Sequence, residues 1–526
     1  LEGRIVHVVV KDEDADTVLA LVARSRFSRA FGSTDRQRSA LRGAAEKVGN
    51  NALPLTLLLE EALASGSTDA VAEAAAALER AAASAPRTWP LLTEAAISAD
   101  DVERIASTSE RLPQEHPFRL VAGISAAFRS GDREELRRAL CKLDARTEAG
   151  EVLPLAAEAL LIRGKARIEP SEALLQRARD LTVRVGADVR ALRALGEAAL
   201  ATGAAAEAAG AFERLLAIAP ESPDPLVWLG KARRQEADAE AAEGLFRRAL
   251  ELSPEHSDAM FALGRLLLDR GEHEQADELF QRIAERDSSS LLGRLGRVEA
   301  LTGMVLLKEA RLQLQGIEES QRSTARVRMT GARLALARGR YSKTLVLLKP
   351  LMKARTGDPR VFALYGDAEY AAGQVNNAAA SYKKALAIDA DLPEALLGIA
   401  EVFVRAERPA HALGVLQQAA ASLASHVRPP QTRARMLTLL GRAHIKAVGG
   451  NTSQKAREAL AAAVAIDGAP AEAFFWLGES QAGVRSSEAR AAYERYLKLR
   501  PNGRYAERAR RALAPRDHSS VVAYNR

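Results

Sequence analysis

The sequence is poor in aromatic residues. Its 526 residues include only 12 Phe, 8 Tyr and 3 Trp, whereas 47% of the chain is hydrophobic and 27% is charged. This composition supplies enough apolar side chains for a core and excludes wholesale disorder. The core must then consist mainly of Ala, Leu and Val. Because Ala and Leu favour helices, while strands favour β-branched and aromatic residues, we predict an all-α protein.

Cysteine is almost absent. The single Cys141 excludes an internal disulfide and a zinc site with several thiolate ligands. A free cysteine commonly behaves as a small core residue. We therefore predict that Cys141 is buried, with a reactive thiol as the alternative.

Long apolar runs are also missing. No run approaches the roughly 18 residues needed to cross a bilayer, and even Leu55–Leu59 is followed by Glu60 and Glu61. The sequence begins with Leu1 rather than Met, so we expect a piece of a longer chain, and the lack of a targeting segment excludes nothing. We favour a cytoplasmic location, with a periplasmic or envelope-associated one as the alternative.

The chain repeats with a period of 34 residues between residues 189 and 424. The first position of the pattern is small in all but one of the periods: Gly196, Gly230, Gly264, Val298, Ala332, Gly366 and Ala400. The next position, 12 residues later, holds Ala208, Ala242, Ala276, Ala310, Thr344, Ala378 and Ala412. Four residues further on, a large side chain follows: Phe212, Phe246, Phe280, Leu314, Leu348, Tyr382 and Leu416. This pattern indicates one repeat array rather than the three or four domains that the length alone suggests.

Each period predicts a helical hairpin. Two stretches with apolar residues at helical spacing flank a break, where Gly203, Gly271, Gly339 and Gly373 occupy equivalent positions. Small residues allow the two helices to cross closely. We expect the large residue to fill the space toward the next hairpin.

These residues resemble the tetratricopeptide repeat. The family pattern is matched best from Pro223 to Pro254, by Leu226, Leu229, Gly230, Ala242, Phe246, Ala249 and Pro254. The resemblance implies a right-handed α-solenoid, a superhelix of stacked helical hairpins. It also implies a concave groove, lined by the first helix of each hairpin, that binds partner proteins.

The repeat pattern divides the chain into segments of different regularity. The strand-like run Ile5–Val10 suggests an edge strand or the remnant of a preceding domain. The predicted segments are an N-terminal extension (1–17), degenerate hairpins (18–188), seven repeats of 34 residues (189–424), two repeats after an insertion (425–502), a capping helix (503–514) and a tail (515–526). A cap is expected because a terminal hairpin otherwise exposes its hydrophobic face.

No pattern of reactive residues indicates an enzyme. The eight histidines show no metal-ligand spacing, and the sequence has neither a Gly-x-x-x-x-Gly-Lys-Ser/Thr loop nor a Gly-x-Ser-x-Gly elbow. The run Gly271–Glu274 merely resembles a ligand cluster, and we interpret it as a polar turn. We therefore predict no catalytic residue, no cofactor and no metal site.

Positive charge is modest overall. The net charge is +7, and the computed pI is about 9.5. The aromatic residues fall at internal repeat positions, so stacking platforms for nucleic acid are not indicated. Both ends are basic, and their charges are either solvated or contact an acidic partner or an anionic lipid surface. They are Arg24, Arg26 and Arg29 near the start, and Arg500, Arg504, Arg508, Arg510 and Arg511 near the finish.

The resemblance assigns candidate binding residues to the groove. They are Arg193, Lys231, Arg234, Phe261, Arg265, Met329, Arg333 and Tyr370, together with Glu197, Asp367, Leu397, Glu401, Arg442 and Glu479. The stretch from Arg193 through Arg265 is mainly cationic, and we hypothesise that it captures an acidic segment or a carboxylate. The alternative is that these are ordinary solvated charges. Chaperone-binding relatives hold a C-terminal carboxylate with paired Lys and Asn residues. No Asn stands at the equivalent first-helix positions here, so binding of a chaperone tail is disfavoured.

The predicted function is a non-catalytic scaffold or adaptor that binds other proteins. The Ala- and Arg-rich composition resembles proteins of high-GC bacteria, where such scaffolds serve secretion, pilus, motility and envelope assemblies. The alternative is a targeting or regulatory segment whose catalytic or membrane domain lies before residue 1. The run Ile5–Val10 favours that alternative. The oligomeric state is left open.

Overall fold

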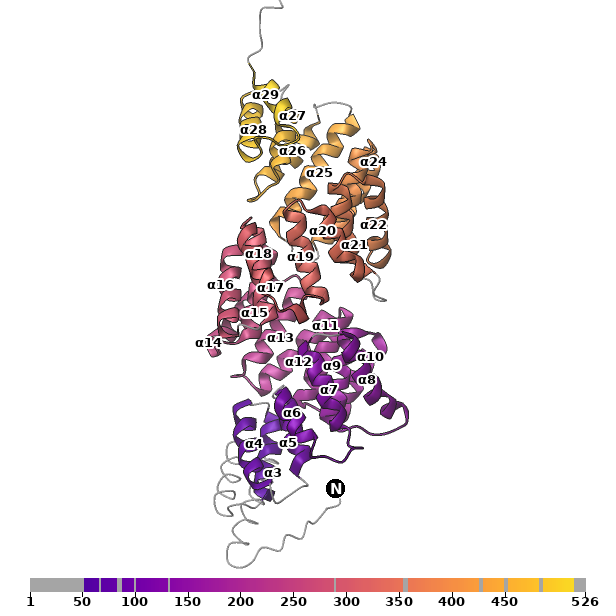
Figure 1. Cartoon of the computed structure of the whole chain (residues 1–526), viewed down its shortest axis with the longest axis vertical. Coiled ribbons are helices and arrows are strands. Elements are labelled where there is room, and N and C mark those ends of the chain that lie inside the picture. Colours follow the sequence, from indigo (N-terminus) through magenta and orange to yellow (C-terminus); the bar gives the residue numbers. More distant parts are fainter. Residues whose placement is uncertain are drawn as a thin grey trace, which may run out of the picture. The chain divides into compact units, whose positions relative to one another are not determined.

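The computed structural model consists of helices joined by short turns (Figure 1). It describes residues 52–65, 68–82, 88–98, 101–130, 133–287, 290–352, 358–424, 429–448, 453–481 and 486–514. Every regular element in these ranges is a helix, including the short 3₁₀ helix η2 (Glu319–Gln321), and none is a strand. The prediction of an all-α fold is confirmed. The run Ile5–Val10, the basic residues near the start and the predicted tail lie outside the described residues.

The described helices belong to two compact units, one extending to Ala259 and the other starting at Met260, with Ala237–Ala239 assigned to the second. The helices of the first unit are α3 (Ala52–Ser65), α4 (Thr68–Ala82), α5 (Trp89–Ser98), α6 (Val102–Ser109), α7 (Phe118–Ser130), α8 (Arg133–Glu148), α9 (Leu155–Ile168), α10 (Glu172–Val185), α11 (Val189–Thr202), α12 (Ala205–Ile218), α13 (Pro223–Gln235) and α14 (Ala239–Leu252).

The second unit continues the alternation of paired helices. Its helices are α15 (Ser257–Arg270), which begins three residues before the boundary, α16 (His273–Arg286), α17 (Leu291–Gly303), α18 (Leu307–Gln315), α19 (Ala325–Ala337), α20 (Tyr341–Met352), α21 (Pro359–Ala371), α22 (Val375–Ile388), α23 (Pro393–Arg405), α24 (Pro409–Ala424), α25 (Pro430–Val448), α26 (Gln454–Val464), α27 (Ala471–Gln481), α28 (Ser486–Leu499) and α29 (Ala506–Leu513).

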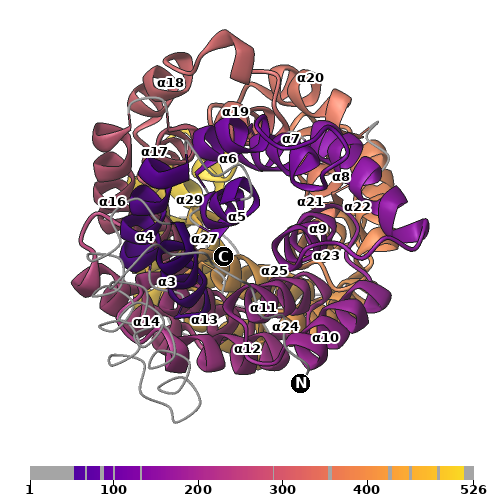
Figure 2. The ribbon, with the colours of Figure 1, turned by 90° about the horizontal axis from the view of Figure 1, so that it is seen from below.

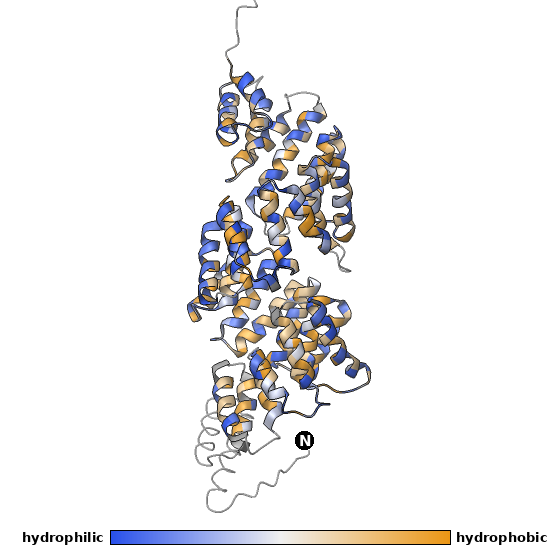
Figure 3. Ribbon diagram, viewed as in Figure 1, coloured by the Kyte–Doolittle hydropathy of each residue, from blue (hydrophilic) through white to orange (hydrophobic). Residues whose placement is uncertain are grey.

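Each unit is a stack of hairpins. In the first unit α11 packs against its partner α12 and against α9 and α13, the first helices of the neighbouring hairpins; in the second unit α21 makes the same contacts with α22, α19 and α23. Figure 2 shows α5, α9 and α11 on the inner side of the first unit and α8, α10 and α12 on its outer side. Hydrophobic and hydrophilic residues alternate along the helices, as expected where each helix buries only part of its surface (Figure 3).

Helix starts follow the local sequence. Pro223, Pro359 and Pro393 stand in the first turn of α13, α21 and α23, where a missing N–H costs nothing. The Asp188 carboxylate caps α11 by accepting a hydrogen bond from the N–H of Arg190 at 2.9 Å, and Ser171 caps α10 in the same way through Leu174. These proline and capping residues fix the positions at which the helices begin within the repeat.

The turn inside each hairpin uses one left-handed residue per repeat. Seven positions spaced 34 residues apart have φ between 56° and 87°: Gly203, Ala237, Gly271, Val305, Gly339, Gly373 and Glu407. The four predicted break glycines are among them. Glycine adopts this conformation freely, whereas a β-branched residue is strained there. The repeat therefore imposes its turn geometry even where the sequence supplies Val305.

Where the large residue of a second helix is aromatic, its ring packs onto glycine. A Cβ added to Gly264 would lie 2.7 Å from the ring of Phe280, and one added to Gly296 of the next hairpin would lie 2.3 Å from the same ring. Tyr382 covers Gly366 and Gly398 in the same way. The ring thus fills the space inside its own hairpin as well as the space toward the next one. The glycines are required by the ring, not only by the crossing of two backbones.

Cys141 is exposed, contrary to the prediction that it is buried. Helix α8 buries Leu136, Leu140 and Leu143, which follow the helical spacing of one face. Cys141 follows Leu140 directly and therefore lies outside this buried face.

Candidate protein-binding site on the inner face

Charged residues recur at one position of the first helices in each unit, and this set of positions is called the charged column below. The residue that follows the first position of the pattern is charged in nine consecutive periods of 34 residues: Arg163, Glu197, Lys231, Arg265, Glu299, Arg333, Asp367, Glu401 and Arg435. The first three belong to the first unit and the other six to the second. The predicted groove residues Glu197, Lys231, Arg265, Arg333, Asp367 and Glu401 belong to this column.

In the first unit the carboxylate of Glu197 partly neutralises the positive charge of the arginines beside it. Arg163 of α9 and Arg193 of α11 both donate from Nε to Oε1 of Glu197, each at 3.0 Å. The exposed fractions of the three side chains are only 8%, 16% and 17% for Arg163, Arg193 and Glu197. Burial alone would raise the pKa of Glu197, but the guanidiniums of Arg163, Arg193 and Arg167 outweigh it and lower the pKa to about 2. Glu197 is therefore ionised at neutral pH.

In the second unit acidic column residues again lie between cations. Glu299 pairs with Arg265 and, at 3.5 Å, with Arg333. Burial would raise the pKa of Glu299, and these two guanidiniums lower it. Further along, Arg435 pairs with Glu401 at 3.1 Å and with Asp367 at 3.8 Å. The cations that the sequence offered to an acidic partner are thus largely engaged within the chain.

A pocket opens on the inner side of the first unit. Its empty volume is about 810 Å³, which includes solvent at its mouth. Most of its lining is apolar and comes from α3, α4, α5, α9, α11, α13 and the end of α12: Leu63, Val71, Ile97, Ala156, Ala159, Leu160, Val189, Leu215, Ala219, Pro225 and Trp228. A concave apolar surface with a few polar groups is typical of a ligand site.

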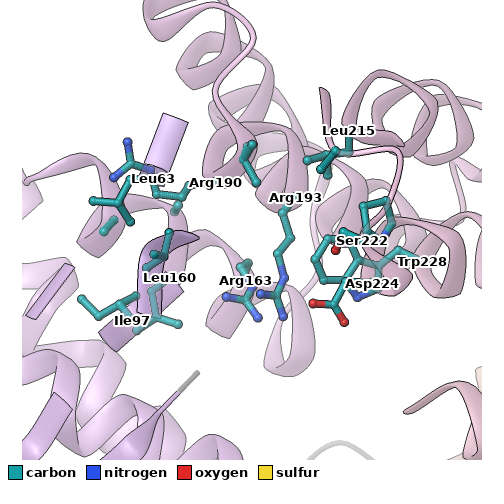
Figure 4. A pocket seen from close by; sticks show the side chains of 16 residues that line it. Leu63, Ile97, Leu160, Arg163, Arg190, Arg193, Leu215, Ser222, Asp224 and Trp228 are labelled. Atoms are coloured by element: carbon teal, nitrogen blue, oxygen red, sulfur yellow. The ribbon is translucent and has the colours of Figure 1, made fainter. Parts of the chain in front are cut away.

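The polar groups of this pocket lie at two ends. Figure 4 shows Arg163 and Arg193 side by side near Asp224 and Trp228, with Arg190 on the other side of the pocket. The guanidinium of Arg193 lies 4.3 Å from the centre of the Trp228 ring, which fixes its orientation. Arg190 is held by Asp188 at 2.8 Å and by Glu94 of α5. The first end therefore carries two guanidiniums together with the carboxylates of Glu197 and Asp224, whereas the second carries two carboxylates around one guanidinium.

The other predicted site residues of the first unit lie on α13. Burial lowers the pKa of Lys231, which is half-buried, and the charges of Asp258 and Glu197 offset this only in part. Arg234 is half-buried one turn further along the helix. Neither residue lines the pocket.

The predicted site residues of the second unit are mostly part of the packing. Phe261 contacts the ring of Phe280 edge-on, with centroids 5.9 Å apart. Met329 packs beside the core of Ala332, Leu348 and Val361. The guanidinium of Arg405 lies over the ring of Tyr370 at 5.6 Å. These three residues are not brought together into one site.

Sequence reasoning missed Arg163, Glu299 and Arg435. All three are in the same column as the predicted residues, at a distance of one or more periods of 34 residues. Extending that interval in both directions would have identified them. Among the described residues no group of three or more His, Cys, Asp and Glu side chains could hold a metal ion. None of the described helices is both long enough and apolar enough to span a bilayer.

Stacked hairpins with an inner charged column define the class of protein, an α-solenoid built from short repeats. Family models described as tetratricopeptide repeat match residues 167–223 and 233–295, and one described as TPR repeat matches residues 366–406. The chain therefore contains tetratricopeptide repeats. No curated protein matches it.

Two solved structures illustrate the similarity. The chain resembles the APC/C hetero-tetramer Cut9–Hcn1 at 12% identity and a TM-score of 0.48, with 94% of this chain and 96% of that chain covered. It also resembles a tetratricopeptide repeat protein from Parabacteroides merdae at 15% identity and a TM-score of 0.40, with 48% of this chain and 98% of that chain covered.

Proposed function

We propose that the chain is a non-catalytic scaffold that binds partner proteins through the inner face of its hairpins, within a bacterial multiprotein assembly. The tetratricopeptide repeats support a role in protein–protein interaction. The observation that carries the proposal for this chain is the apolar pocket of the first unit, with Arg163 and Arg193 at one end.

The pocket suits a partner segment that combines an apolar side chain with a carboxylate. The apolar lining would cover the side chain, because burial of apolar surface favours association. The two guanidiniums would share their charge among Glu197, Asp224 and the partner carboxylate, and Arg is suited to such recognition because it can donate two hydrogen bonds to one carboxylate. From the sequence, the binding of an acidic segment is predicted for the whole stretch from Arg193 to Arg265. We restrict this binding to the pocket.

Ser222 offers a test that leaves the ion pairs intact. It lines the pocket and begins α13, but its side chain makes no capping hydrogen bond. A Ser222→Phe variant should therefore fill the pocket without removing a stabilising contact. Tagged wild type and variant would be used to purify partners from cells of the source organism, and the enriched proteins compared by mass spectrometry.

The expected result is that proteins enriched by the wild type are lost with Ser222→Phe and retained with Ser253→Phe, a substitution outside the pocket lining. The Lys231→Glu, Arg234→Glu variant tests the neighbouring cations separately. Retention of every partner by a folded Ser222→Phe protein would contradict the assignment of the pocket.

A further inference from the structure

The net positive charge of this protein is concentrated in one stretch of the sequence. Between Glu319 and Asp358 the sequence has no Asp or Glu and ten basic residues: Arg322, Arg326, Arg328, Arg333, Arg338, Arg340, Lys343, Lys349, Lys353 and Arg355. The whole chain has 75 Lys and Arg against 68 Asp and Glu. Without these ten it would have 65 against 68, a net charge of −3. The stretch contains α19 and α20, which lie between two of the segments matched by family models.

Three arginines gather where this hairpin meets the preceding one. Arg338 ends α19, Arg340 stands in the turn to α20, and Arg311 belongs to α18, which packs against α19. Desolvation and the charges of Arg340 and Arg311 lower the pKa of Arg338. In contrast to Arg333, which pairs with Glu299, none of the three pairs with a carboxylate in the part of the chain that the structure describes. Like charges without a carboxylate partner favour the arrival of an anion.

Exposed aliphatic side chains accompany the arginines. Leu312, next to Arg311 on α18, is 65% exposed, and Val346 of α20 is 69% exposed. These two residues are exactly one repeat apart, so they occupy the same position on successive second helices. Val305, in the turn before α18, is 72% exposed. The surface formed by Val305, Arg311, Leu312, Arg338, Arg340 and Val346 is called the basic ridge below.

We propose that the basic ridge binds an acidic segment of a partner protein, with aliphatic residues between its carboxylates. The guanidiniums match carboxylates in charge and geometry, and Leu312 and Val346 offer apolar contacts spaced along the stack. A segment lying across α18 and α20 would meet both kinds of contact. The ridge belongs to the second unit, so it is a different site from the pocket of the first unit.

Two other polyanions fit the ridge less well. Single-stranded nucleic acid binds through aromatic stacking as well as phosphate contacts, and the only aromatic residue of the hairpin, Tyr341, is half-buried. An anionic bilayer is bound by a broad apolar helix face that enters the lipid. The aliphatic side chains of the ridge are instead separated by charged residues.

Fluorescence anisotropy of the full chain tests the proposal. The probe is a labelled synthetic peptide rich in Asp and Glu with two Leu residues, and the comparison peptide carries Asn and Gln in place of the acids. We expect the wild type to bind only the acidic peptide, more weakly as salt increases. The Arg311→Glu, Arg338→Glu, Arg340→Glu variant should lose at least about tenfold in affinity, because charge complementarity is reversed.

A matched control carries the same change of charge elsewhere in the second unit. Lys383 and Lys384 of α22 and Lys498 of α28 are exposed, and their replacement by Glu should leave peptide affinity unchanged. The Leu312→Gln, Val346→Gln variant should weaken binding by a smaller factor, about threefold, through lost apolar contact. Circular dichroism verifies folding of each variant. If the Glu triple fails to fold, the corresponding Gln triple replaces it.

Three results would overturn the proposal. The first is equal binding of the acidic and amide peptides by the wild type. The second is an equal loss of affinity in the ridge variant and the Lys383, Lys384, Lys498 control. The third is tighter binding of phosphatidylserine vesicles or of a single-stranded oligonucleotide than of the peptide, abolished by the ridge variant, which would assign the surface to that class of polyanion.

Discussion

Arg163 and Glu197 are one repeat apart and are joined by a hydrogen bond of 3.0 Å from Nε to Oε1. The bond links the first helix of one hairpin to the first helix of the next. Arg193 donates to the same oxygen from within α11, so one carboxylate connects three charged side chains. In this unit the repeat therefore couples neighbouring hairpins electrostatically as well as through the core.

Replacement of Glu197 by Gln should lower stability at neutral pH by about 3 kcal/mol, because a buried charge pair is broken and two guanidiniums are left facing each other. The pKa of Glu197 is lowered from 4.5 to about 2, so its stabilising contribution is complete above pH 4.5 and lost as the pH falls toward 2. The urea midpoints of wild type and Glu197→Gln should differ most at pH 7 and converge in acid. Glu221→Gln, an exposed change, is the control. A constant difference across this range would refute the ionic role.

Val305 provides a second prediction. Its φ of 64° is the left-handed conformation that the equivalent Gly339 adopts with a φ of 69°. The side chain is 72% exposed, so its removal loses little buried surface. Val305→Gly should therefore stabilise the protein by about 0.5–1 kcal/mol, since relief of strain exceeds the added entropy of the unfolded chain. Gly339→Val should destabilise it by a similar or larger amount, and the two urea midpoints measure both effects. A lower midpoint for Val305→Gly would show that the turn is not strained.

The hairpins could be predicted from sequence because their determinants lie within one period. Gly203 and Gly271 marked the turns, and Phe280 and Tyr382 marked the large core positions, since each contacts residues at fixed spacing. A local pattern of size is enough to predict such contacts. The domain boundaries, by contrast, stay a prediction.

The ion pairs could not be predicted in the same way. A charged side chain such as that of Arg265 can be solvated, form an ion pair within the chain or bind a ligand. The sequence alone does not distinguish these three environments. Its pairing with Glu299 depends on how far neighbouring first helices are rotated against each other. The pairing of Arg190 with Glu94 depends on the curvature of the first unit, which brings α11 to α5 across 96 residues.

Cys141 gives a third prediction, which follows from its corrected placement. Because the thiol is exposed on α8, it should react fully with a thiol reagent such as Ellman's reagent in the native protein. The same amount of product should form with and without denaturant, and only the rate should differ. Cys141→Ser supplies the blank. Reaction only after unfolding would show that Cys141 is buried and would contradict its exposed placement.

The last prediction distinguishes glycines that pack against an aromatic ring from glycines that do not. A Cβ at Gly398 would lie 2.3 Å from the ring of Tyr382, whereas nothing lies within 4 Å of a Cβ at Gly414 in the following helix α24. Gly398→Ala should destabilise the protein by about 1–3 kcal/mol through overpacking. Gly414→Ala should stabilise it by up to about 1 kcal/mol, because alanine is the better helix former. Both midpoints are read from the same urea titration followed by circular dichroism. Combining Gly398→Ala with Tyr382→Leu should recover part of the loss if the ring causes it, and no recovery would mean that the glycine serves the backbone crossing instead.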